Sequence, residues 1–282
     1  MKIRGKSFEW GKRTYLMGVL NVTPDSFSDG GEFNTLDSAL AQAENMVASG
    51  VDIIDIGGQS TRPGAVEISL EAELDRVVPV VQMLRQKADI FANVPISVDT
   101  TRAQVAKAAV EAGADIVNDI SGATFDSQML LTVAHLKVPI ILMHIRGTPQ
   151  TMQKLTEYRD LIGEIGEFLE NRIEAAVAAG IDKSQIIIDP GIGFAKTCSQ
   201  NLEILRELPN FRYLNCPILV GVSRKSFIGQ ILEQPEAKQR IWGTAAACTG
   251  AIANFADILR VHDVREMRDV CRVADAIFRN QS

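Results

Sequence analysis

Eight short apolar runs divide the chain, and each ends in a polar residue or a glycine-rich turn. The runs end at Asn21, Asp55, Asp99, Asn118, His144, Asp189, Ser223 and His262. They are continuous in Val, Ile and Leu rather than alternating with polar residues, which is typical of parallel strands covered on both faces. Helix-length stretches separate them. This α/β pattern predicts a (β/α)8 TIM barrel with its active site at the C-terminal ends of the strands.

The stretches between the runs repeat apolar residues with a helical period. Ser69 is expected to cap a helix that begins at Leu70, and Pro79 to bend that helix or end it early. Gly50, Gly113 and Gly180 follow helical stretches, where a residue with positive φ is needed before the chain turns into the sheet. Further helices are predicted over residues 156–179, about 237–254 and 264–278, the last with Asp263 as its N-cap.

Length and composition describe an ordinary globular chain. Its 282 residues fit one barrel domain over residues 1–282, with a core from about 14 to 279. The net charge of −6 and the pI near 5.2 argue against a nucleic-acid surface, although a local basic cluster can still bind small anions. No apolar run reaches the roughly 18 residues of a membrane span, and the N-terminus lacks the apolar core of a signal peptide. We therefore expect a cytoplasmic protein without a membrane partner.

The four cysteines stand far apart and form no metal-binding spacing. Reduced thiols in a cytosolic protein are the expected state. Cys248 and Cys271 fall in helical patterns and are interpreted as packing residues.

Four hydrogen-bonding residues close apolar strands: Asp55, Asp99, Asn118 and Asp189. Each one alone is as well explained as the N-cap of the next helix. All four at one level of a barrel are harder to explain by capping. Convergent acceptors suit a flat heterocycle with a row of N–H donors, such as a pterin or a guanine-like ring, because a carboxylate accepts two parallel N–H bonds.

Cationic residues also gather at the predicted strand ends. Arg62, Lys225, Arg260 and His262 lie at or just past them, and guanidinium groups bind phosphate bidentately. Basic residues at the mouth of an acidic barrel suggest an anionic substrate, and ordinary surface salt bridges are the alternative. Asn21 could contribute one oxygen to Mg²⁺ beside phosphate oxygens and water.

Three long polar loops follow strands, over residues 22–34, 57–68 and 145–155. Long loops rich in polar residues at this face are usually functional. The segments GGQSTRPG and DPGIGFAK within or near this face lack the spacing of nucleotide-binding fingerprints. We interpret their glycines as turns that let backbone N–H groups approach a ligand.

Six segments carry a resemblance to a known family: GVLNVTPDSFSDGG, GGQSTRPGA, SVDT, DPGIGFAK, GVSRKS and RVHD, in that order. Together they closely resemble the motifs of the bacterial dihydropteroate synthases, a pterin-binding family. The resemblance runs from about Tyr15 to the C-terminus. Two departures are Gln59, where glutamate is common, and Ala195, where glycine is common.

The resemblance implies a fold, a reaction and a set of residues. Members are (β/α)8 barrels, usually homodimers, that join 6-hydroxymethyl-7,8-dihydropterin diphosphate to 4-aminobenzoate in folate biosynthesis and release diphosphate with Mg²⁺. The implied pterin pocket contains Asp99, Asn118, Met143, Asp189 and Lys225. The implied diphosphate ligands are Asn21, Thr61, Arg62, Arg260 and His262, with Asn21 also at Mg²⁺. The implied aminobenzoate site, where sulfonamides compete, contains Phe27, Thr61, Pro63, Phe194, Ser223 and Lys225. The expected catalytic residues are Asp29, Arg62, Asp189 and Lys225.

The expected mechanism is electrostatic. Diphosphate leaves a pterin methylene carbon whose positive charge the ring can delocalise, and the cations stabilise the leaving group. Asp29 would approach the cationic carbon when the first loop closes. The alternatives are a pterin-binding methyltransferase domain and a non-catalytic pterin-binding barrel. The Arg260 and His262 pair argues against the methyltransferase, because a methyl donor needs no diphosphate site.

Overall fold

A computed structural model of the chain describes residues 1–23, 32–62 and 64–279. Eight parallel strands form its central sheet in the order β8-β7-β6-β5-β4-β3-β10-β9. A parallel bridge between Ile188 and Ile218 links the two ends of this order and closes the barrel. The strands are β3 (Tyr15–Asn21), β4 (Ile53–Gly57), β5 (Ile96–Asp99), β6 (Ile116–Asp119), β7 (Ile140–Met143), β8 (Ile186–Asp189), β9 (Leu219–Val220) and β10 (Ile258–Val261).

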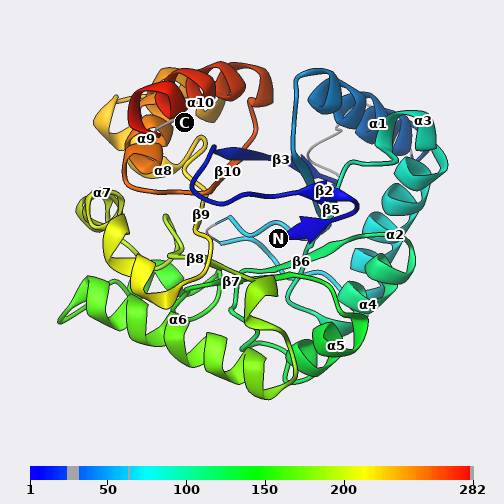
Figure 1. Cartoon of the computed structure of the whole chain (residues 1–282), viewed down its shortest axis with the longest axis horizontal. Coiled ribbons are helices and arrows are strands. Elements are labelled where there is room, and N and C mark those ends of the chain that lie inside the picture. The colour runs from blue at the N-terminus through cyan, green and yellow to red at the C-terminus, as the bar shows by residue number, and fades with distance from the viewer. Residues whose placement is uncertain (24–31, 63, 280–282) are drawn as a thin grey trace.

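At least one helix follows each strand of the barrel in the chain. Together the helices form an outer ring around the strands (Figure 1). The α-helices are α1 (Glu32–Ala48), α2 (Leu70–Gln86), α3 (Ala88–Phe91), α4 (Ala103–Glu111), α5 (Met129–Leu136), α6 (Leu161–Ala178), α7 (Cys198–Arg206), α8 (Ser226–Ile231), α9 (Ile241–Ala253) and α10 (Val264–Phe278). Short 3-10 helices are η2 (Met152–Lys154), η3 (Lys183–Gln185), η4 (Leu208–Leu214) and η5 (Ala237–Gln239). The predicted TIM barrel is confirmed.

Several local predictions are confirmed as well. Ser69 caps α2 by accepting a hydrogen bond from the Ala72 N–H at 3.1 Å. Gly50, Gly113 and Gly180 all have positive φ, between 86° and 117°. The last helix spans the predicted residues 264–278. These features depend on local chemistry, and local sequence is therefore enough to predict them.

Pro79 does not end its helix, so early termination, one of its two predicted effects, does not occur. α2 continues from Leu70 to Gln86 with Pro79 inside it. The proline removes one backbone hydrogen bond, but Val77 on one side of it and Val80 and Val81 on the other are buried in the core. Packing of both halves against the sheet outweighs the lost bond.

Two other predicted helices begin later than expected. The stretch 156–179 becomes α6 only from Leu161, because the Asp160 carboxylate accepts from the Gly163 N–H at 3.0 Å and caps the helix there. The stretch 237–254 divides into η5 and α9 at Arg240. The Arg240 guanidinium turns back and donates to the Gln234 carbonyl at 2.9 Å, so the chain bends at this residue.

A hairpin of β1 (Lys2–Ile3) and β2 (Lys6–Ser7) covers the end of the barrel where the strands begin. It lies across the ring of strands in Figure 1. Phe8 packs on Tyr15 with ring centroids 4.7 Å apart, and this cluster joins residues from the first positions of the strands. The buried Asp52 accepts from Lys6 at 2.7 Å and from Arg13. Because this end is filled, ligands must enter at the C-terminal ends of the strands.

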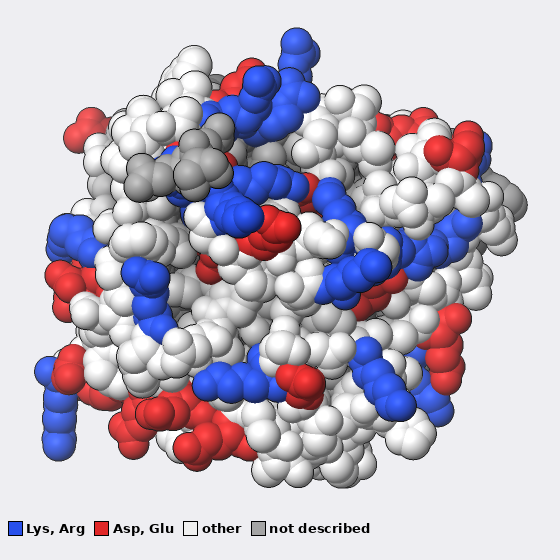
Figure 2. Space-filling model, in the orientation of Figure 1, with Lys and Arg blue, Asp and Glu red and all other residues white. Residues whose placement is uncertain are grey.

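Charges on the outer surface are mixed. Basic and acidic side chains are interleaved across the face seen in Figure 2, and several form ion pairs, including Arg4 with Asp115 at 3.0 Å. This mixture of charges accompanies a net charge of −6. Among the described residues, no helix has the length and apolar character needed to cross a membrane.

The barrel core generates a stability prediction. Ile54 on β4 is fully buried, so Ile54→Ala should lower the free energy of unfolding by about 2–5 kcal/mol through lost burial and a residual cavity. The exposed Leu131 on α5 supplies the control, since Leu131→Ala should stay within about 0.5 kcal/mol of the parent. Urea unfolding followed by circular dichroism measures both. Equal effects of the two substitutions would contradict the assignment of Ile54 to the core.

Candidate active site

Three strand ends bring Asp55, Asp99 and Asn118 together around Arg260. The Arg260 Nε donates to Asp55 Oδ2 at 2.6 Å, and its terminal nitrogen donates to Asp99 Oδ2 at 2.7 Å. Asn118 donates its side-chain N–H to the same Asp55 oxygen at 3.1 Å. The Arg260 guanidinium therefore joins β10 to β4 and β5 at the mouth of the barrel, and Asn118 links β6 to the same group through Asp55.

The capping alternative does not explain these residues. The first N–H of α4, at Ala103, donates to Asp126 at 2.8 Å rather than to Asp99. Asp55 and Asp99 are both buried and point into the barrel mouth toward Arg260. Within the described part of the chain, the other Asp55 oxygen, Oδ1, is buried without a hydrogen-bond partner. A buried acceptor without a partner is costly, so these groups are held ready for a donor.

Burial sets the protonation of this group. It raises the pKa of Asp99, and the nearby Arg260 opposes that rise. Burial by itself lowers the pKa of Arg260, but the carboxylates of Asp55 and Asp99 outweigh it, so the pKa lies above its usual range. The guanidinium thus stays charged and holds the two acidic side chains in place.

Asp189 and Lys225 form the other side of the mouth. Asp189 ends β8 and accepts from the Gly191 N–H at 2.7 Å. Burial raises its pKa to about 6, although that N–H and Lys225 oppose the change. Burial lowers the pKa of Lys225 to about 8, with Asp189 opposing. The Lys225 ammonium lies 4.2 Å from the centre of the Phe194 ring, so a cation and an aromatic face flank the acid.

His262 lies beside Ser223. The His262 Nδ1 is 3.0 Å from the Ser223 hydroxyl, which also accepts from the His262 backbone N–H at 3.2 Å. Burial lowers the pKa of His262 to about 3, and the charges of Arg224 and Arg260 add to the effect. The imidazole is therefore neutral at pH 7. A serine hydroxyl that donates to Nδ1 leaves the imidazole proton on Nε2, and this Nε2–H group can donate a hydrogen bond to an anion.

The remaining predicted phosphate ligands are more open. Asn21 and Thr61 are half-buried and Arg62 is exposed. The Asn21 side-chain oxygen and Asp99 Oδ2 both lie 3.7 Å from the point that a Cβ on Gly57 would occupy. The structure therefore places Asn21 beside the acidic residues, while Arg62 stands outside them. Phe27, Asp29 and Pro63 lie outside the described residues.

Asn21 is the predicted protein ligand of Mg²⁺. Its side-chain oxygen lies near Gly57, whereas Asp99 Oδ2 accepts from Arg260 at 2.7 Å. Mg²⁺ prefers oxygen ligands and needs few from the protein when phosphate is present. No cluster of three or more His, Cys, Asp or Glu side chains suited to a metal occurs in residues 1–23, 32–62 and 64–279. The Asn21 oxygen fits a cation that is held mainly by a bound phosphate.

Sequence reasoning missed a buried lysine. Lys196 has 4% of its surface exposed and donates to His144 Nδ1 and to the Phe194 carbonyl, both at 2.9 Å. Burial lowers the pKa of His144 to about 2, and Lys196 adds to that shift. Its neighbour Ala195, at the position where glycine was expected, has φ of 52°. The only sequence signal for this packing is a lysine directly after a strand-end turn.

Gln59, to which no role was assigned, braces its loop. Its side-chain N–H donates to the Val66 carbonyl at 3.0 Å, and its oxygen accepts from the Ile68 N–H at 2.9 Å. An amide can donate and accept at once, whereas a carboxylate only accepts. Glutamine at this position therefore closes the loop after β4 onto itself.

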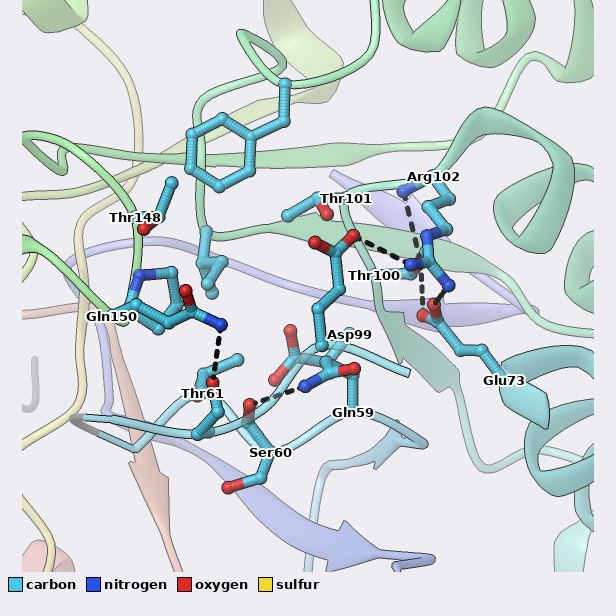
Figure 3. A pocket seen from close by; sticks show the side chains of 15 residues that line it. Gln59, Ser60, Thr61, Glu73, Asp99, Thr100, Thr101, Arg102, Thr148 and Gln150 are labelled. Atoms are coloured by element: carbon cyan, nitrogen blue, oxygen red, sulfur yellow. Dashed lines mark hydrogen bonds and ion pairs between the residues drawn. The ribbon is translucent and has the colours of Figure 1, made fainter. Parts of the chain in front are cut away.

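A cavity of about 150 Å³ opens beside the mouth, between the loops that follow β4, β5, β6 and β7. Of the residues bonded to one another around Arg260, only Asp99 lines this cavity. On its wall, Glu73 accepts from Thr100 at 2.6 Å and from Arg102 at 3.1 Å, as Figure 3 shows. Thr148 and Gln150 face this cluster from the loop after β7. The cavity adjoins the candidate active site and does not contain Asp189 or Lys225.

The fold and the site together define a barrel enzyme that binds a polar heterocycle and an anion. The profile of the family described as pterin binding enzyme matches residues 17–262. A dihydropteroate synthase of Synechocystis is 61% identical over 96% of this chain and 93% of its own length. The chain therefore belongs to the dihydropteroate synthases, a family of pterin binding enzymes.

Solved structures support the same assignment. A Yersinia pestis dihydropteroate synthase with a sulfonamide drug complex superposes with a TM-score of 0.91 at 43% identity, covering 98% of each chain. A Xanthomonas albilineans dihydropteroate synthase with 4-aminobenzoic acid gives a TM-score of 0.87 at 42% identity, covering 94% of this chain and 93% of that one. The fold and the family agree.

The raised pKa of Asp189 generates a stability prediction. The unfolded chain ionises this carboxyl near its ordinary pKa, whereas the folded state resists ionisation until about pH 6. The folded protein therefore loses stability as pH rises between about 4 and 6. Asp189→Asn should raise the free energy of unfolding at pH 8 by about 1–3 kcal/mol, with little difference at pH 4.

Urea unfolding at the two pH values measures this effect. The exposed Asp75 on α2 provides the control, because Asp75→Asn should leave the free energy of unfolding almost unchanged at both. A destabilised Asp189→Asn protein at pH 8 would show that the buried carboxylate is better satisfied than its surroundings indicate.

Proposed function

We propose that this protein joins 6-hydroxymethyl-7,8-dihydropterin diphosphate to 4-aminobenzoate, forming 7,8-dihydropteroate and diphosphate in folate biosynthesis. The observation that carries the proposal is the group of buried acceptors at the ends of β4, β5, β6 and β8, placed beside Lys225, Arg260 and His262. This arrangement offers acceptors to a heterocycle and cations to a leaving diphosphate in one barrel mouth. The family membership supports the same reaction.

The pterin ring would lie among Asp99, Asn118 and Asp189. Carboxylates accept paired N–H bonds from an amidine-like edge, and the Asn118 amide can both donate and accept. The buried Met143 pairs in register with Asp189 and would cover the ring from β7. Lys225 would close the other side. Because the three polar groups are buried, their bonds to the ring would form in a site largely shielded from water.

The diphosphate would meet Arg260, His262, Asn21, Thr61 and Arg62. Arg260 is charged but committed to Asp55 and Asp99 in the structure. A bound diphosphate would therefore accept hydrogen bonds from the Arg260 guanidinium, and the N–H groups of the ring would donate to the carboxylates. These contacts would replace part of the ion pairing between Arg260 and the two aspartates. Arg62, exposed at the loop after β4, is the residue with the greatest freedom to move onto the anion.

The aminobenzoate would lie between Phe194, Ser223 and Thr61, with the Lys225 ammonium near its carboxylate or ring face. Phe194 is buried and offers an aromatic wall beside that cation. The relative crystallised with 4-aminobenzoic acid supports an aminobenzoate site in this fold. Phe27 and Pro63 remain predictions for the same site.

In the proposed reaction the carbon–oxygen bond to diphosphate breaks first and the ring carries the positive charge. The arylamine nitrogen then forms the new carbon–nitrogen bond and loses one proton to solvent. Arg62, Arg260 and His262 stabilise the leaving group, and Asp99 and Asp189 hold the ring and offset its charge. Mg²⁺, held by Asn21 and phosphate oxygens, would add Lewis-acid stabilisation of the leaving group. Asp29 would approach the cationic carbon.

The test is to incubate the protein with the dihydropterin diphosphate, 4-aminobenzoate and Mg²⁺ and to follow both products. Formation of diphosphate and dihydropteroate, dependent on aminobenzoate, is expected. Asp189→Asn should lose pterin binding in isothermal titration while still folding. No product from a protein that binds pterin would favour the methyltransferase or the non-catalytic barrel instead.

Lys225 generates a kinetic prediction. Lys225→Ala removes the ammonium beside Asp189 and the Phe194 ring, and turnover should fall about 100-fold. The control is Lys183→Ala, because Lys183 is exposed in η3 at the opposite end of β8. Steady-state rates at saturating substrates measure both variants. Unchanged turnover in Lys225→Ala would remove this residue from the proposed machinery.

We also propose a homodimer, formed through an apolar surface on α8, α9 and α10. Trp242 is 82% exposed, Ile277 65% and Val273 62%, and α9 packs against α10. Exposed apolar clusters of this kind mark interaction sites. A second copy of the chain is the proposed occupant, which buries the same surface on both copies.

Light scattering coupled to size exclusion tests the dimer. The wild type should have about twice the chain mass of 30.8 kDa, and Ile277→Glu should give the monomer because a charge would be buried in the interface. Leu131→Glu, on α5, places the same charge on another exposed leucine and should leave the dimer intact. A wild-type monomer at high protein concentration would contradict the proposal.

A cytoplasmic location belongs to the proposal as well. The four cysteines are all unpaired, and three of them are buried. Unpaired thiols are typical of a reducing compartment. This supports the location that the sequence predicts.

A further inference from the structure

Arg224 occupies an unusual place in the chain. It stands between Ser223 and Lys225, which the proposed function places against aminobenzoate, and its φ is 60°. This left-handed backbone is uncommon for a residue with a long side chain and costs energy. The strained turn makes the side chain of Arg224 diverge from those of its two neighbours.

Both the backbone and the side chain of Arg224 are held by hydrogen bonds. Its backbone N–H donates to the hydroxyl of the buried Thr244 at 3.1 Å, and its carbonyl accepts from Arg240 at 3.0 Å. Its guanidinium makes a bidentate pair with Asp263, at 3.0 and 2.5 Å. Strained backbone persists where surrounding contacts hold it in place. Contacts to α9, to the residues before α9 and to the start of α10 hold this turn.

The ion pair between Arg224 and Asp263 has a neighbour, the hydrogen bonds between Ser223 and His262. Asp263 follows His262 in sequence, and Arg224 follows Ser223, so the Arg224–Asp263 pair lies next to the Ser223–His262 contacts at 3.0 and 3.2 Å. Two adjacent links thus join the loop after β9 to the loop after β10. The first loop carries aminobenzoate residues and the second carries diphosphate residues.

Asp263 is placed for this link rather than for capping. It occupies the N-cap position of α10 but makes no side-chain cap bond to that helix. Both members of the pair are largely shielded, with 24% of the Arg224 side chain and 15% of the Asp263 side chain exposed. A bidentate, partly buried pair holds its geometry far better than a single exposed one.

We propose that Arg224 and Asp263 form a positioning clamp that holds Ser223 and Lys225 against Arg260 and His262. The inference rests on the proposed function for what those four residues bind. The clamp touches neither substrate. It acts by fixing where the aminobenzoate residues stand relative to the leaving diphosphate, and misplacement of such groups by about 1 Å can cost two orders of magnitude in rate.

Arg224→Asn tests the clamp without penalising the fold. Asparagine adopts left-handed backbone more readily than arginine, so thermal stability should be maintained while the ion pair is lost. We expect the KM for aminobenzoate to rise about tenfold with a smaller fall in kcat, because the bound geometry loosens. Lys183→Asn removes one positive charge from an exposed site at the other end of the barrel and should change neither constant.

The exchange of partners provides the rescue. Asp263→Arg should resemble Arg224→Asn, and the double variant Arg224→Asp with Asp263→Arg should recover most of the aminobenzoate affinity, since aspartate also tolerates the left-handed backbone. A role in folding alone predicts a loss of stability in both single variants. The clamp predicts a loss of aminobenzoate affinity in stable proteins, with recovery on exchange.

A spectroscopic readout does not depend on turnover. The charged groups around His262 are Arg224, Arg260, Asp263 and Lys225. In Arg224→Asn the positive charge that lowers the pKa of His262 most among its charged neighbours is removed while Asp263 stays, so the pKa of His262 should rise. The chain has only three histidines, and imidazole ¹⁵N resonances can resolve this one during a pH titration.

Two outcomes would overturn the inference. One is an Arg224→Asn protein whose KM for aminobenzoate and His262 titration both equal those of the wild type. The other is an exchange variant that stays as impaired as the single variants. If the wild type makes no dihydropteroate, the proposed function fails, and the His262 titration still decides whether Arg224 and Asp263 hold the two loops together.

Discussion

The parallel register of the barrel is the constraint on which the site depends. Asn21 pairs with Gly57, Gly57 with Asp99, and Asp99 with Asn118 across the four neighbouring strands β3, β4, β5 and β6. On the other side of the barrel, Met143 pairs with Asp189. Backbone hydrogen bonds therefore bring side chains that are far apart in sequence to one level. The N-terminal hairpin fills the opposite end, so this level is the one that ligands can reach.

Burial of charge at this level is the second determinant. Asp99 and Asp189 are buried acids whose pKa values are raised, and Arg260 and Lys225 are the cations that oppose the rise. Such a cluster costs stability in the unliganded protein, because each group loses water without full replacement. Binding sites commonly keep groups of this kind, since a ligand that completes their hydrogen bonds gains what the free protein lacks.

The loops add order that the barrel does not impose. Gln59 braces the loop after β4, Lys196 braces the turn after β8, and Arg224 braces the turn after β9. Two of these turns contain a non-glycine residue with positive φ, Ala195 and Arg224. Gln59 acts within its own loop, whereas Lys196 also contacts His144 after β7 and Arg224 contacts Asp263 at the start of α10. The mouth is therefore supported by more than one loop.

The sequence by itself determined the fold, the level of the site and the residues that gather there. Apolar runs that end in Asp55, Asp99, Asn118 and Asp189 were enough, because strand patterning and capping are local and parallel strands align their ends. Local patterning left open whether Pro79 bends or ends α2, and packing of the buried residues on both sides keeps the helix continuous. It erred at Arg240, where the predicted helix divides into η5 and α9.

Only the tertiary structure decided which of the predicted side chains bind to one another. Arg260, expected to bind phosphate, also holds Asp55 and Asp99, and Asp263, expected to cap a helix, holds Arg224. Glu73 had no motif to reveal it, and Lys196 ends the segment DPGIGFAK without a role having been assigned to it. Partners of this kind come from different strands and loops, up to 205 residues apart for Arg260 and Asp55. Their contacts depend on closure of the barrel, which places in one small volume groups that sequence spacing alone leaves unrelated.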